Sequence, residues 1–209
     1  MGLMDLPSPT GSLPPLQLEL VNALRSEDLV MKRHLLKIVG ADFGFYSGDK
    51  MVLFAHKEGF KLKAAITVFL DQARTKPVLG IKARQVIDFA AAYDVTDLVT
   101  NQTVGILKRK GWASITQDKW VICDPMEREI ALLQEDNLLL ALVRRLLTNL
   151  VPQNYDILVG EQRIVDLKQN FNPFTYHLRV DFKVPETQFD RRLAVAAAVL
   201  LGSIEGRQN

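Results

Sequence analysis

The sequence is poor in the residues that build disulfide frameworks and metal centres. Its 209 residues include one cysteine, Cys123, which excludes an internal disulfide and fits a reducing compartment. The three histidines, His34, His56 and His177, are scattered and have no Cys, His or carboxylate at ligand spacing. The sequence also lacks a phosphate-binding loop and a nucleophile elbow. We therefore predict a non-enzymatic protein with no metal, no cofactor and no catalytic residues.

Long hydrophobic runs are missing as well. The most apolar stretch, Leu138 to Val151, is interrupted by Arg144 and Arg145 and is too short to span a membrane. The N-terminus does not place a basic region before an apolar run, so no export signal is predicted. We expect a protein without a membrane span in the cytoplasm.

Charge is distributed unevenly along the chain, although the net charge is only +2. Residues 57–110 contain ten Lys or Arg against five Asp or Glu. A basic excess of this kind favours an anionic partner for the region, whereas a solvated helical face would give the same count. Composition leaves both interpretations open.

The clearest pattern lies between Ile81 and Pro125. Apolar residues at helical spacing predict a helix from Ile81, a short helix over 94–99 and a third helix that ends at Gly111. Strands are expected over 112–116 and 120–123, because β-branched and aromatic residues flank the polar turn at 117–119. This order of elements is typical of a winged helix.

These residues also resemble a known family. The segments TVGILKRKGWASI and QDKWVICDP are similar to the recognition helix and wing of Crp-like bacterial transcription regulators. The resemblance covers about a fifth of the chain and implies a winged helix that binds duplex DNA. It implies that Asn101 and Gln102 contact base edges, and that Lys108, Arg109 and Lys110 neutralise phosphates.

The chain is expected to have four regions. Residues 1–15 are rich in proline and predict an extended arm. Residues 16–80 predict an N-terminal α+β region, residues 81–125 the winged helix, and residues 126–209 a C-terminal region of helix, sheet and helix. The expected fold class is α+β, mostly helical, with a central winged helix-turn-helix and a small C-terminal antiparallel sheet.

The elements outside the winged helix are predicted from hydrophobic periodicity. Apolar residues at three- and four-residue spacing indicate helices, and alternation of apolar and polar residues indicates strands. The final helix has a seam of Phe189, Leu193, Ala196, Ala197 and Leu200. The predicted helices are 16–24, 29–39, 58–74, 126–150 and one opened by Pro185; the predicted strands are a hairpin over 43–54 and the segments 155–159, 163–167 and 176–184.

Two functions are consistent with these features. The first is a winged-helix nucleic-acid-binding protein, such as a transcription regulator. The second is a structural subunit of a larger assembly, such as a phage virion or a secretion machine. The second is favoured by the proline-rich arm and by apolar helices that predict a homo-oligomer, or contacts with partner subunits, through residues 126–150, 187–201 or both.

Overall fold

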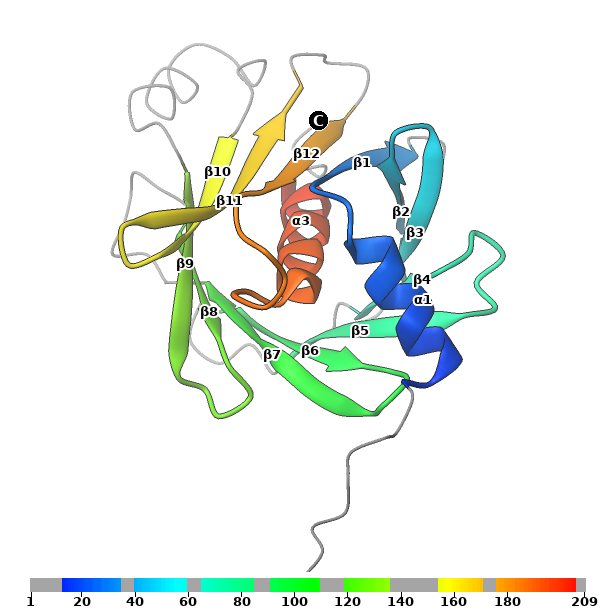
Figure 1. The fold of residues 1–209 in the computed structure, drawn as a ribbon, viewed down its shortest axis with the longest axis horizontal. Helices are drawn as coiled ribbons and strands as arrows, with labels where there is room; N and C mark the ends of the chain where they lie inside the picture. Colours follow the sequence, from blue (N-terminus) through cyan, green and yellow to red (C-terminus); the bar gives the residue numbers. More distant parts are fainter. Residues whose placement is uncertain are drawn as a thin grey trace, which may run out of the picture.

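The fold is a closed barrel of antiparallel strands around a helix (Figure 1). The structure is a computed structural model, and it describes residues 13–34, 40–59, 65–84, 91–109, 119–135, 154–170 and 176–205. Within these residues, twelve strands each pair with the next one along the chain, and β1 closes the barrel by pairing with β12.

Two helices accompany these strands in the described part of the chain. Helix α1 spans Pro15–Leu24 and α3 spans Arg191–Glu205. The strands are β1 (Asp28–His34), β2 (Ala41–Ser47), β3 (Lys50–Lys57), β4 (Ala65–Phe69), β5 (Pro77–Ala83), β6 (Ala92–Asp97), β7 (Gln102–Arg109), β8 (Lys119–Cys123), β9 (Glu129–Glu135), β10 (Asn154–Val159), β11 (Gln162–Gln169) and β12 (His177–Phe182).

Alternation of side chains decides which face of each strand turns into the barrel. Leu29 and Met31 in β1 are fully buried, whereas Lys32, which points to the opposite face of the strand, is partly exposed. In β12, Leu178 and Val180 are buried and Arg179 is exposed. Because successive side chains on a strand point to opposite faces, this pattern fixes the pairing register as well.

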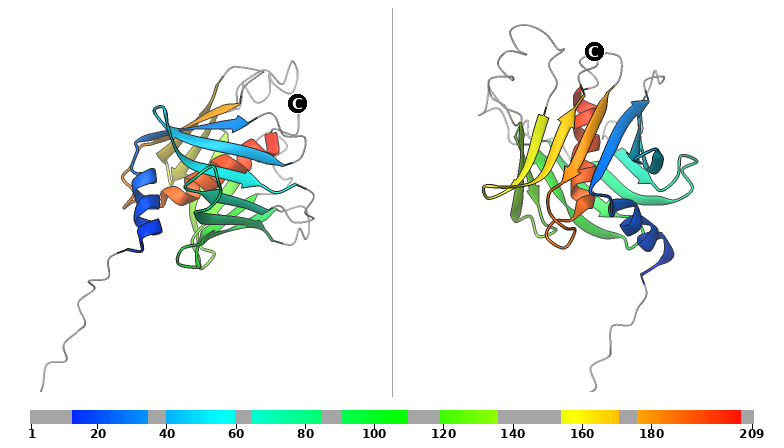
Figure 2. Two further views of the ribbon diagram at one scale, coloured as in Figure 1. Left: turned by 90° about the vertical axis from the view of Figure 1, so that its right-hand side faces the viewer. Right: turned by 45° about the horizontal axis from the view of Figure 1, so that its top comes forward.

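Helix α3 fills the interior of the barrel. Figures 1 and 2 show it running through the middle of the ring of strands. No residue from Leu193 to Leu201 is more than 3% exposed, so the helix is buried on every side. Among the described residues, the lumen is therefore a packed core, and any ligand has to bind outside it.

Close packing of α3 depends on a glycine in β7. A Cβ built on Gly105 would lie 2.5 Å from the Cys123 carbonyl oxygen and 3.0 Å from a methyl carbon of Leu193. The absence of a side chain at this position thus lets β8 and α3 approach β7 together.

We expect Gly105→Ala to lower the free energy of unfolding by about 1–3 kcal/mol, as overpacking of a core does. Chemical denaturation followed by far-UV circular dichroism would measure the change. Gln102→Ala, at the exposed start of the same strand, is the control and should change the value by less than about 0.5 kcal/mol. Equal effects of the two substitutions would show that the close approach at Gly105 does not limit the packing.

The winged helix predicted over 81–125 is wrong. The start of the first predicted helix is occupied by the end of β5, which reaches Ala83. The second predicted helix overlaps β6, and the third is occupied by strand β7. The cause is visible in β7, where Ile106 and Leu107 are both buried although they point to opposite faces. A strand buried on both faces has no alternation, and its apolar run resembles one side of a helix. The predicted strand over 112–116 lies outside the described residues.

The predicted fold class, α+β and mostly helical, is also wrong. Segments of predicted helices at 29–39, 58–74 and 126–150 are occupied by β1, β4 and β9. In β4, for example, only Ile66 and Val68 are buried. So short a pattern does not distinguish the two-residue period of a strand from the 3.6-residue period of a helix.

Several predicted elements are confirmed. They are helix 16–24 as α1, the 43–54 hairpin as β2 and β3, strand 120–123 as β8, and the three C-terminal strands as β10 to β12. The final helix is confirmed as α3, but it begins at Arg191 and not at Pro185.

Candidate functional site

The residues expected to bind DNA are spread along β7. Asn101 lies in the β6–β7 turn with a positive φ of 56°, and Gln102 begins the strand. Lys108 and Arg109 end it, roughly 20 Å away at about 3.3 Å per residue. Lys108 and Arg109 are adjacent on the strand, and their side chains therefore point to opposite faces. Lys110 lies outside the described residues.

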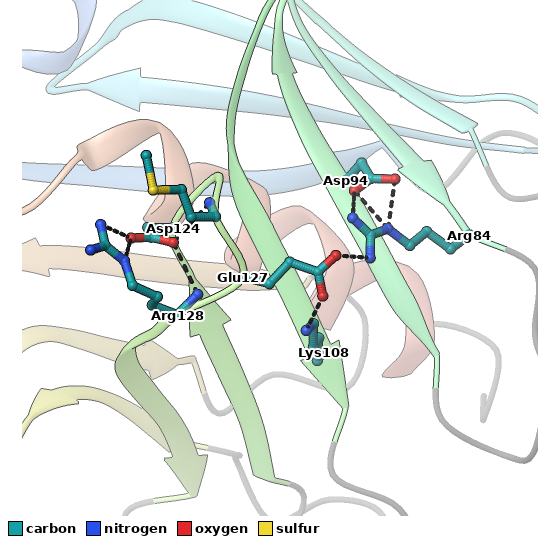
Figure 3. Close-up of polar contacts among 7 residues, drawn as sticks. Arg84, Asp94, Lys108, Asp124, Glu127 and Arg128 are labelled. Atoms are coloured by element: carbon teal, nitrogen blue, oxygen red, sulfur yellow. Dashed lines mark hydrogen bonds and ion pairs between the residues drawn. The ribbon is translucent and has the colours of Figure 1, made fainter.

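Lys108 is part of an ion-pair network on the outer face of the barrel (Figure 3). Its Nζ donates to Glu127 Oε2 at 2.7 Å, and Arg84 Nη1 donates to Glu127 Oε1 at 2.8 Å. The Arg84 Nε also donates to Asp94 at 2.8 Å. The network joins the β8–β9 turn, which carries Glu127, to β6, β7 and the residue after β5.

The turn that carries Glu127 is held by Asp124. Its Oδ1 accepts hydrogen bonds from the backbone N–H groups of Met126 at 2.9 Å and Arg128 at 3.0 Å. Its Oδ2 accepts from the Arg128 side chain at 2.6 Å. Glu127 has a φ of 64°, which is uncommon for a residue with a side chain. The turn is thus fixed in the form that presents Glu127 to the two cations.

The network perturbs the ionisation of its members. The hydrogen bond from Lys108, followed by that from Arg84, lowers the pKa of Glu127 to about 2. The same bond from Lys108 to Glu127 raises the pKa of the lysine. Lys108 is therefore neutralised by a carboxylate of its own chain, and this arrangement suits a clamp between strands better than a phosphate contact.

We expect Glu127→Gln to lower stability at pH 7. The pKa of Glu127 is lowered on folding from its ordinary 4.5 to about 2. Its contribution is therefore complete above pH 4.5 and disappears as the pH falls towards 2.

Thermal unfolding of the wild-type and variant proteins between pH 2 and 7 would measure the difference. Their curves should differ at neutral pH and converge in acid. Glu161→Gln is the control, since Glu161 is exposed and makes no ion pair with a described residue. A difference between wild type and Glu127→Gln that is constant with pH would contradict the interpretation.

A groove opens at the end of the barrel where α3 begins. Figure 2 shows α1 lying at this end. One wall is α1, with Gln17, Leu20, Val21 and Leu24, and the other is the segment 186–192. The volume is about 390 Å³. Leu20, Leu24 and Phe189 are buried and supply apolar surface.

Arg191 is the buried cation of this groove. Only 9% of the residue is exposed. Its Nη1 donates to the carbonyl oxygens of Leu24 at 2.6 Å and Ser26 at 2.8 Å, and its Nη2 donates to that of Val184 at 3.4 Å. The guanidinium also lies 4.3 Å from the centre of the Phe182 ring. Its Nε is buried without an acceptor, and the guanidinium forms no ion pair with a described carboxylate.

Arg192, the next residue, differs from Arg191 because its guanidinium is paired with carboxylates. Its Nη1 pairs with Asp97 at 2.6 Å, and its Nε and Nη2 bind Asp190. The hydrogen bonds that Arg192 donates to Asp190 are the main cause of the raised pKa of the arginine. Asp97 is 1% exposed and also accepts hydrogen bonds from the N–H groups of Val99 and Thr100. These bonds fix the start of α3 to the β6–β7 turn.

Sequence reasoning missed the groove because its walls lie more than a hundred and fifty residues apart in the chain. A signal was nevertheless present. Two consecutive arginines open an otherwise apolar helix, where the helix dipole disfavours positive charge. Such a pair indicates partners from elsewhere in the fold.

The described residues contain no group of His, Cys, Asp and Glu side chains that could hold a metal ion. Neither α1 nor α3 is long and apolar enough to cross a membrane. Comparisons with known protein families, with curated proteins and with solved structures find no match to this chain.

Proposed function

We propose that this chain is a non-enzymatic binding protein that holds a small ligand in the groove between α1 and residues 186–192. The groove lined by Arg191 is the observation that carries the proposal. Its volume of about 390 Å³ lies within the range of small-molecule sites, which is about 300–1,000 Å³. Four of its eleven lining residues are apolar and seven are polar or charged, so the groove offers a ligand both kinds of contact.

The two walls of the groove differ in how firmly they are held. The segment before α3 is fixed through Arg192 and Asp97, which form a largely buried ion pair. Helix α1 is anchored by Leu20 and Leu24 and by the ion pair of Glu19 with Lys76 on the surface. The exposed ion pair contributes only about 0–1 kcal/mol, so α1 is held mainly by its buried leucines and by the hydrogen bond that Arg191 donates to the Leu24 carbonyl oxygen.

A nucleic-acid-binding function loses the support that it had from the sequence. Its support was the winged helix, which the barrel replaces, and Lys108 pairs with Glu127 instead of standing free. The groove lies outside a barrel whose interior is filled. A protein that binds a small ligand accounts for this position better than a nucleic-acid-binding protein does.

We expect Val21→Trp, which fills the groove from α1, to weaken binding of the fluorescent probe 8-anilinonaphthalene-1-sulfonate at least about tenfold, equivalent to 1.4 kcal/mol. Fluorescence titration would measure the dissociation constant. Asn22→Trp is the matched control, since this neighbouring residue is exposed and does not line the groove. Its affinity should equal that of the wild type. Equal affinity of Val21→Trp and the wild type would refute the proposed site.

A second candidate function is that of an assembly subunit. Residues 193–201 are buried inside the barrel and cannot provide the expected contact. An apolar pair within the other predicted segment, 126–150, favours the surface at the β8–β9 turn and the start of β9, since Met126 is 76% and Ile130 38% exposed. We expect homo-oligomers or partner subunits to meet there.

Sedimentation velocity at micromolar concentration would test this second candidate. The wild-type protein should sediment as an oligomer, and the double variant Met126→Glu, Ile130→Glu as a monomer. Leu13→Glu, which changes an exposed leucine beside α1, should leave the oligomer intact. A monomeric wild-type protein would exclude self-association through this surface.

A further inference from the structure

We infer that the ligand of the groove is an amphipathic anion, namely an aliphatic chain that ends in a carboxylate. This inference rests on the proposed function, because it assigns a chemical class to the ligand of the same groove. Its two parts follow from two sets of residues: Arg191 for the charged head, and the buried side chains of α1 and Phe189 for the chain.

The charged head is indicated by the state of Arg191. A buried guanidinium loses its hydration and is usually matched by a carboxylate or a phosphate. Here its acceptors are three neutral carbonyl groups, and Nε has none. A buried donor without an acceptor in a folded protein commonly marks the place of a bound water or ion. An anion in the adjoining groove would supply both the missing acceptor and the missing charge.

A single negative charge fits the groove better than a double one. Glu186 is exposed on its rim and makes no ion pair with a described residue, and Asp190 lines it as well. Both carboxylates repel an incoming anion, and they repel a phosphate dianion more strongly than a carboxylate. Arg192 cannot offset this repulsion, because Asp190 and Asp97 already occupy its guanidinium.

The aliphatic chain is indicated by the rest of the lining. Leu20, Leu24 and Phe189 are each no more than 6% exposed, and Val21 is half-buried beside them. Because Leu20, Leu24 and Phe189 are already buried, an alkyl chain laid over this surface would remove apolar area from water mainly on the ligand itself and on Val21, at about 25 cal/mol per Å². The lining thus favours a ligand with an apolar body over a small hydrophilic anion.

Head binding and the position of α1 are coupled. The Nε of Arg191 is enclosed, so the head reaches it only when the groups that cover this atom move aside. The same guanidinium holds the C-terminal carbonyl of α1 through Leu24. A carboxylate that binds Arg191 would therefore compete with, or reorient, the attachment of this helix.

The test compares four ligands that share a ten-carbon chain: decanoate, decanol, decylammonium and decyl phosphate. Their affinities for the full chain at pH 7.5 would be measured by displacement of 8-anilinonaphthalene-1-sulfonate. We expect decanoate to bind about ten- to hundredfold more tightly than decanol, as one charge-assisted hydrogen bond allows. Decyl phosphate should bind more weakly than decanoate, and decylammonium the most weakly.

Two arginine variants locate the head. Arg191→Gln should reduce the affinity for decanoate to that for decanol and leave decanol unchanged, whereas Arg191→Lys should keep part of the preference. Arg25→Gln removes an exposed arginine close to the end of α1 and should change neither affinity. If Arg191→Gln does not fold, the ranking of the four ligands on the wild-type protein decides the question.

The outcomes separate this inference from the proposed function. Equal affinities of decanoate, decanol and decylammonium for the wild type would overturn the anion inference, while loss of all three in Val21→Trp would still support a site in the groove. A decanoate preference that survives in Arg191→Gln would also overturn it. If the wild type binds neither the probe nor any of the four ligands, the proposed function fails together with the inference.

Discussion

The packing of α3 inside the barrel is the interaction on which the rest of the structure depends. An α-helix with its side chains is about 10–12 Å across. Barrels of eight strands enclose only side chains, and barrels of sixteen or more leave a channel. A ring of twelve strands leaves an intermediate space, and a helix rich in alanine fills it. Strand number and helix composition are therefore matched.

A helix buried on all sides must also have its ends satisfied. At the start of α3, the Asp190 carboxylate accepts a hydrogen bond from the backbone N–H of Arg192 at 3.0 Å. At its other end, Lys57 Nζ donates to the Ser203 carbonyl oxygen at 3.4 Å. An anion at the N-terminus and a cation at the C-terminus both complement the helix dipole. The residue before the helix and the last residue of β3 thus supply groups that a solvated helix would obtain from water.

How much of the fold could be predicted from the sequence depended on the number of buried faces in each strand. In β12, alternation of Leu178 with Arg179 indicated a strand, because only the inner face is apolar. In β7, the neighbours Ile106 and Leu107 are both buried, and the alternation that identifies a strand is lost. The candidate sites were harder still. Lys108 and Glu127 are separate in the sequence, and only strand pairing brings them together.

The chain order of the barrel has a consequence for biosynthesis. Each strand from β1 to β11 pairs with the next strand in the sequence, but β1 can pair with β12 only after the last strand is made, and the core helix follows β12. Until α3 leaves the ribosome, the apolar inner faces of all the preceding strands have nothing to pack against. Nascent chains with exposed strand edges and apolar surface are prone to aggregate. Because α3 follows all twelve strands in the chain, the barrel can close around its core helix only after the last strand and the helix have been made.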